Sequence, residues 1–105
     1  MPEESLSERI ARATDPEQTM RGERPDTPYI EDAEHWLQVY SDMRRFKEVV
    51  LQMSHQEVKE RDPAIGEELT SVDIPLLEAE HARAVRRQEF WQLRLAELRS
   101  QQASG

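Results

Sequence analysis

The sequence of 105 residues contains no cysteine and only three glycines. The absence of cysteine excludes disulfide scaffolds, thiolate zinc sites and cysteine nucleophiles. Nowhere do 18 apolar residues follow one another, so the sequence contains no candidate for a membrane-spanning helix. No glycine-rich loop precedes a lysine and a hydroxyl residue, which excludes the common phosphate-binding motif of nucleotide hydrolases. These absences remove many kinds of catalytic chemistry.

The charge is negative overall and unevenly distributed. The chain has 22 acidic and 14 basic side chains, with a net charge of −2 in residues 1–24, −9 in residues 25–80 and +3 in residues 81–105. Because nucleic-acid affinity depends largely on neutralising phosphates, an acidic protein is not expected to bind nucleic acid. The first ten residues lack the basic start and apolar stretch of a signal peptide. We therefore expect a cytoplasmic protein with no nucleic-acid or membrane partner.

Residues 1–28 differ in composition from the rest of the chain. Their apolar residues are scattered and four prolines interrupt them. This composition predicts a flexible acidic arm. Leu6, Ile10 and Ala13 share a helical face and permit a short helix, which would need to dock because so few turns do not hold alone in water.

A long helix is predicted over residues 29–61. Thr27 can cap it with its hydroxyl, Pro28 suits the first helical position, and Glu31 and Asp32 lie near the positive end of the helix dipole. Apolar residues then recur at steps that repeatedly return to one helical face. They are Trp36, Val39, Tyr40, Met43, Phe46, Val50 and Met53.

A second helix is predicted over residues 75–100. Two prolines and a glycine predict a connection over residues 62–74, and residues 101–105 are expected to fray. Within the second helix, spacings alternating between four and three predict a heptad seam, and therefore packing of helix on helix. The seam consists of Leu77, His81, Ala84, Gln88, Trp91, Leu95 and Leu98.

These elements predict an all-α fold of two long antiparallel helices, a helical hairpin over residues 29–100. Two amphipathic helices bury only part of their apolar surface, so we expect a second copy to complete a four-helix bundle through a two-fold axis. The residues expected in this self-association seam are Trp36, Tyr40, Met43, Phe46, Val50, Leu77, Ala84, Trp91, Leu95 and Leu98.

One local pattern suggests a metal site. Glu78 and His81 stand three apart on one helical face, a spacing that can place a carboxylate and an imidazole on the same ion. The pattern resembles the E-x-x-H element of ferritin-like bundles, including two-helix versions that assemble the site between subunits. The resemblance implies iron or another divalent metal, with Glu48 or Glu34 supplying a further carboxylate. The alternative is that His81 simply fills a seam position.

Other candidates have simpler structural explanations. His55 lies close to Ser54 and Glu57, but residues so close on one helix cannot meet as a catalytic triad. Several cations and aromatics of the second helix could bind an anionic groove or a membrane surface. The interpretation favoured by the net charge is that the arginines pair with the acidic first helix and that the tryptophan is buried. These residues are Arg83, Arg86, Arg87, Phe90, Trp91 and Arg94.

The function predicted from the sequence is a non-catalytic, self-associating helical module that interacts with or regulates another protein. No cofactor is required for this function. The alternative is a ferritin-like oligomer that binds or oxidises iron at the E-x-x-H pair.

Overall fold

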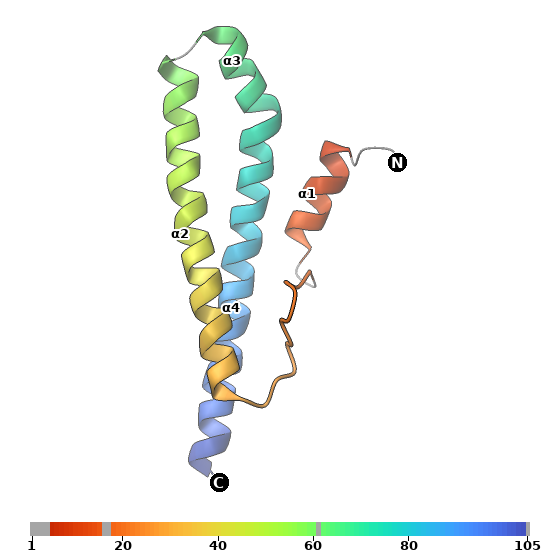
Figure 1. The fold of residues 1–105 in the computed structure, drawn as a ribbon, viewed down its shortest axis with the longest axis vertical. Helices are drawn as coiled ribbons and strands as arrows, with labels where there is room; N and C mark the ends of the chain where they lie inside the picture. Colours follow the sequence, from red (N-terminus) through yellow and green to blue (C-terminus); the bar gives the residue numbers. More distant parts are fainter. Residues whose placement is uncertain (1–4, 16–17, 61, 105) are drawn as a thin grey trace.

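The computed structural model describes residues 5–15, 18–60 and 62–104. Its elements are α1 (Leu6–Thr14), α2 (Ile30–Glu60), α3 (Pro63–Glu68), the π-helical turn η1 (Leu69–Asp73) and α4 (Ile74–Ser104). No strand occurs in these described ranges, so the prediction of an all-α class is confirmed. The long helices α2 and α4 lie side by side and run in opposite directions, with α1 on the other side of α4 (Figure 1).

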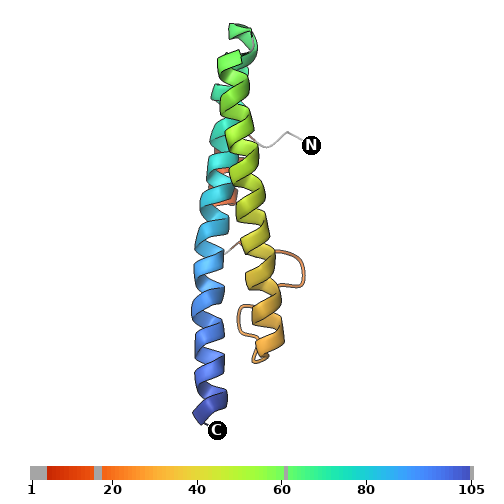
Figure 2. The ribbon, with the colours of Figure 1, turned by 90° about the vertical axis from the view of Figure 1, so that its left-hand side faces the viewer.

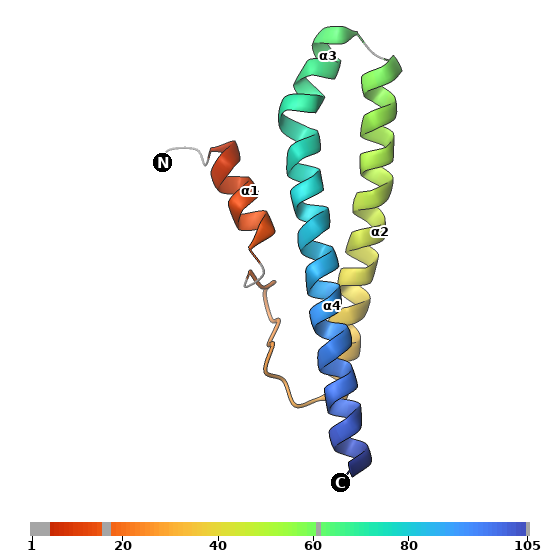
Figure 3. The same ribbon diagram turned by 180° about the vertical axis from the view of Figure 1, so that it is seen from behind.

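The three helices form a single thin layer. The molecule measures 61 × 34 × 15 Å, and its shortest dimension is little more than the diameter of one helix. Its radius of gyration is 17.3 Å, whereas a compact chain of this length would have about 13 Å. The edge-on view in Figure 2 and the reverse view in Figure 3 show this flat arrangement. Neither broad face of the layer is covered by further helices of the described chain.

The start of α2 is fixed by the side chain that the sequence marks as a cap. The hydroxyl of Thr27 accepts the backbone N–H of Tyr29 at 3.2 Å and donates to the carboxylate of Asp32 at 2.6 Å. Thr27 is buried. This local network turns the chain into the first helical turn at Ile30.

The segment predicted as a connection, residues 62–74, is almost entirely helical. Asp62 caps α3 by accepting the N–H of Ala64 at 2.9 Å, and Pro63 occupies the first turn, where a missing N–H costs nothing. In η1 the N–H of Ile74 bonds to the carbonyl of Leu69, five residues earlier. This wider turn immediately precedes Pro75, and it provides room for a proline ring that would clash within a regular α-helix. The chain therefore reverses before Pro63 and continues as one interrupted helix.

The core lies where the first half of α2 packs on the second half of α4. Its buried residues are Ala33, Tyr40, Trp91, Leu95 and Leu98. Four of these residues were predicted in the self-association seam, namely Tyr40, Trp91, Leu95 and Leu98. The single chain already buries these four and Ala84, which was also predicted there. Trp36, Met43, Val50 and Leu77 are half-buried, whereas Phe46 is exposed.

The N-terminal segment differs from the predicted flexible arm in its described part. Ser5 caps α1 by accepting the N–H of Glu8 at 3.1 Å, and α1 lies against α4. Residues 18–29 then run along α4 without regular secondary structure, with turns at residues 21–22 and 25–26 (Figure 1). Polar contacts with α4, described below, provide the docking that scattered apolar residues did not predict. At the other end, α4 continues through Ser104, although fraying was expected from residue 101.

Replacing Leu95 with alanine should lower the free energy of unfolding by about 2–5 kcal/mol, because it removes a side chain from the closed core. Leu95 is 5% exposed, whereas Leu93, two residues earlier on the same helix, is 70% exposed. Leu93→Ala should change stability by less than about 0.5 kcal/mol. Urea unfolding followed by circular dichroism measures both variants, and equal effects would contradict this assignment of the core.

Candidate functional site

The carboxylate of Glu23 is fully buried, since its side chain is 0% exposed. It accepts the backbone N–H of Met20 at 2.9 Å and the indole N–H of Trp91 at 2.8 Å. The guanidinium of Arg87 donates to it at 2.5 Å, and the hydroxyl of Tyr40 also donates to it. Its oxygens therefore receive four donors from three parts of the chain. We call Glu23, Tyr40, Arg87 and Trp91 the Glu23 clasp.

A tight turn places the Glu23 carboxylate among its four hydrogen-bond donors. The N–H of Glu23 donates to the carbonyl of Met20 at 3.0 Å, and Gly22 between them has a φ of 85°. This left-handed conformation is readily adopted by glycine and costs other residues free energy. Gly22 thus allows the turn that places a carboxylate between α2 and α4.

Three arginines of α4 hold the N-terminal segment along its length. Besides the contact of Arg87 with Glu23, Arg83 donates to the carbonyl of Gln18 and Arg94 to that of Thr27, each at 2.8 Å. Positions 83, 87 and 94 share one helical face because they are four and seven residues apart. We expected these arginines to pair with the acidic first long helix; instead, the hydrogen bonds described here join them to the N-terminal segment.

The surroundings of the clasp fix its protonation state. Burial raises the pKa of Glu23, but the hydrogen bonds from Arg87, Tyr40, Met20 and Trp91 outweigh burial and leave the pKa below 4.5. Burial, followed by the hydrogen bond to the Glu23 carboxylate and its charge, raises the pKa of Tyr40 to about 12. At neutral pH the carboxylate is ionised and the phenol keeps its proton. A carboxylate with four donors and no exposure is suited to holding structure rather than to accepting a proton from a substrate.

A second set of polar contacts joins α2 to α4. Lys47 lies 2.8 Å from Glu80, and Gln88 donates to the hydroxyl of Ser41 at 2.9 Å. His81 Nε2 lies 3.1 Å from Glu48 Oε1. His81 and Gln88, the two polar residues of the predicted heptad seam, thus contact polar side chains of α2. Such matching favours one register of the two helices over others.

The structure brings together two of the four predicted metal ligands. His81 and Glu48 are in contact, and Glu48 also lies 3.4 Å from Arg44 Nε. Glu78 and Glu34 are both exposed. Glu34 lies near the start of α2, which packs beside the second half of α4, whereas His81 belongs to the first half. Among the described residues, no three histidine, aspartate or glutamate side chains are arranged to hold a metal ion. His81 and Glu48 form a contact between α4 and α2.

One apolar surface is left open on α2. Phe46, Val49 and Met53 are 64%, 52% and 63% exposed, and their spacing of three and four places them on one helical face. We call them the α2 stripe. Phe46 was predicted in the self-association seam. Val49 was not, because the predicted apolar face of this helix contains its neighbour Val50 instead.

Comparison of the chain with models of known protein families, with curated proteins and with solved structures finds no match. Within the described residues, every helix is too short or too polar to cross a membrane.

Replacing Glu23 with glutamine should lower the free energy of unfolding at pH 7 by about 3–5 kcal/mol, because Arg87 then stays buried without its countercharge. Since the pKa of Glu23 is lower in the folded protein than the ordinary 4.5, its stabilisation is present above about pH 4.5 and is lost as the pH falls further. Urea unfolding between pH 3 and 7 should show a shallower acid loss in the variant. Glu89→Gln, at an exposed position, is the control, and equal profiles for the two variants would contradict the clasp.

The second prediction for the clasp concerns Tyr40, one of two tyrosines in the chain. In the Tyr29→Phe variant, ultraviolet titration of the remaining phenol should give a midpoint near pH 12, against about 10 in denaturant. Because the folded pKa is the higher one, stability should decrease as the pH rises from 10 towards 12. A midpoint near 10 in the folded variant would show that the phenol does not donate to Glu23.

Proposed function

We propose that this chain is a non-catalytic helical module that self-associates and presents a helical surface to another protein. The observation that carries the proposal is the exposure of the α2 stripe. Phe46, Val49 and Met53 are large apolar side chains, and the single chain leaves each of them more than half exposed. A contiguous apolar stripe on a helix is typical of a surface that packs against another helix.

The surface area of the single chain supports this proposal. It exposes 7457 Å², whereas a compact protein of 12.3 kDa would expose about 6100 Å². A standard interface removes about 800 Å² from each partner. The excess surface is therefore large enough to supply such an interface.

The arrangement proposed for the assembly is a four-helix bundle made from two helical hairpins, each formed by α2 and α4. A two-fold axis near Val49 would place Phe46 opposite Met53 of the second copy. Contacts between a methionine sulfur and an aromatic ring are favourable, and methionine adapts to irregular gaps. This pairing would bury the α2 stripe of both copies at once.

The clasp supports a non-catalytic role. Glu23 is the most enclosed carboxylate described, and its oxygens already receive four donors. These hydrogen bonds hold the N-terminal segment to α2 and α4. The cysteine-free composition agrees with the reducing cytoplasm that we propose as the location.

Light scattering coupled to size-exclusion chromatography at micromolar concentration should give a mass of about 25 kDa, twice that of the 12.3 kDa chain. Phe46→Glu should give a monomer, because a charge at the stripe would be buried without a partner in the dimer. Leu93→Glu places the same charge at an exposed apolar position of α4 and should leave the dimer intact. Circular dichroism checks that all three proteins are folded. A wild-type monomer with a cooperative thermal transition would refute the proposal.

A further inference from the structure

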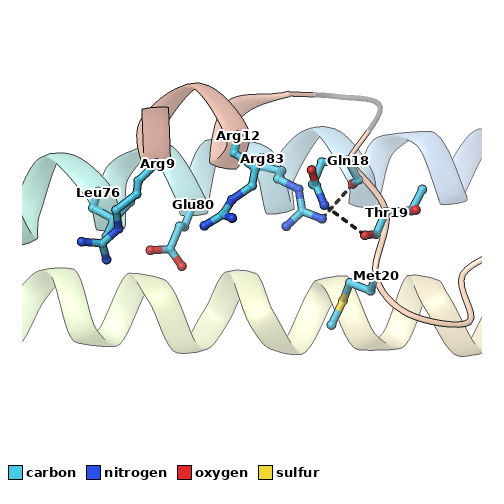
Figure 4. Close-up of a pocket in the computed structure, with 8 residues that line it drawn as sticks. All are labelled: Arg9, Arg12, Gln18, Thr19, Met20, Leu76, Glu80 and Arg83. Carbon is cyan, nitrogen blue, oxygen red and sulfur yellow. Dashed lines mark hydrogen bonds between the residues drawn. The ribbon is translucent and has the colours of Figure 1, made fainter. Parts of the chain in front are cut away.

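A cavity of about 390 Å³ opens between α1, α4 and the start of the segment formed by residues 18–29 (Figure 4). It lies apart from the α2 stripe, on the side of α4 that faces α1. Eight residues line it, and they come from all three of these parts of the chain. They are Arg9, Arg12, Gln18, Thr19, Met20, Leu76, Glu80 and Arg83.

The charge of this cavity is opposite to that of the protein. Arg9 and Arg12 come from α1 and Arg83 comes from α4, so three guanidinium groups meet in a chain of net charge −8. Figure 4 shows Arg9 on one side of the Glu80 carboxylate and the other two arginines on the opposite side. Glu80 is the acidic residue of the lining, and Lys47 outside it lies 2.8 Å from its carboxylate. The lysine balances the carboxylate, and the cavity remains positive.

Two of these arginines have unused hydrogen-bonding capacity. The guanidinium of Arg9 makes no hydrogen bond or ion pair within the described part of the chain. Arg83 uses one terminal nitrogen, Nη2, for the carbonyl of Gln18, which leaves its other terminal nitrogen to donate to an anionic oxygen. Guanidinium groups offer such oxygens two parallel N–H bonds.

We propose that this cavity binds a small molecule carrying a phosphate group. A phosphate group has a charge between −1.5 and −2 and three acceptor oxygens at neutral pH, so it suits several guanidinium groups better than one carboxylate does. Its oxygens contact Arg9 and Arg83, while Leu76 and Met20 contact any apolar part of the molecule. The volume lies within the range of about 300–1000 Å³ that is usual for small-molecule sites.

Binding has a structural consequence for α1. This helix has nine residues, which is too few to be stable by itself in water. Arg9 of α1 and Arg83 of α4 both line the cavity. An anion that bonds to both arginines connects the two helices, so the bound molecule holds α1 in place on α4.

Isothermal titration calorimetry on the full chain tests this site, with inorganic phosphate and phenyl phosphate as probes and sodium chloride added to keep the ionic strength constant. We expect saturable binding of at least one probe at one site per chain. Arg9→Gln and Arg83→Gln should each weaken it at least tenfold. The matched control is Arg99→Gln, an exposed arginine near the other end of α4, which should bind as the wild type does.

The two probes distinguish the source of the phosphate group. Tighter binding of phenyl phosphate identifies an esterified ligand that uses Leu76 and Met20, and tighter binding of inorganic phosphate identifies the free ion. Either result supports the site. Absence of saturable binding by both probes, or equal affinity in the wild type and Arg9→Gln, would overturn it.

Folding and assembly are measured on the same samples. Arg83 also holds the carbonyl of Gln18, so Arg83→Gln could disturb the fold, whereas the side chain of Arg9 is exposed and makes no other described contact. The result with Arg9→Gln therefore decides the proposal. Light scattering should give the same mass for Arg9→Gln as for the wild type, which separates this site from self-association through the α2 stripe.

Discussion

The docking of the N-terminal segment onto the two long helices depends on the buried carboxylate of Glu23. It bonds to Tyr40 of α2 and to Arg87 and Trp91 of α4, so a single side chain connects the N-terminal segment to both long helices. Enclosing a charge costs several kcal/mol unless it is paired and hydrogen-bonded. The four donors meet this requirement only when all three parts of the chain are in place. The clasp therefore favours one arrangement of these parts over looser packings of the same apolar surfaces.

Because a thin layer of helices has a small apolar core, the Glu23 clasp contributes a large share of the stability. Five of the eight buried apolar side chains described form one cluster, at the end of the layer where α2 starts. Above it, α2 and α4 are connected by polar pairs such as Lys47 with Glu80 and Gln88 with Ser41. These part-buried polar pairs favour one register of the two helices over others. Stability thus comes mainly from one end of the molecule, where the core and the clasp are adjacent.

The sequence predicts those features that repeat along the chain. Periodic apolar residues predict both long helices, and the antiparallel arrangement expected from them places Glu48 within reach of His81, although the sequence predicted it only as a further metal ligand. The clasp could not be predicted in this way, because Glu23 and Arg87 are 64 residues apart and a lone glutamate has no periodicity. The helix through Pro75 was missed for a different reason. Proline normally ends a helix, and only the wider turn of η1 makes it compatible with one.

The order of the helices in the layer decides which surface remains for a partner. α4 lies in the middle and is contacted by α2 on one side and by α1 and the arginine-bound segment on the other. Its buried residues Trp91, Leu95 and Leu98 and its arginines Arg83, Arg87 and Arg94 already have partners within the chain. α2 lies at an edge, contacts α4 along one face only, and carries Phe46, Val49 and Met53 outside that contact. A partner helix that packs on α2 can bury these side chains without displacing the clasp, so the proposed association leaves the fold of each chain unchanged.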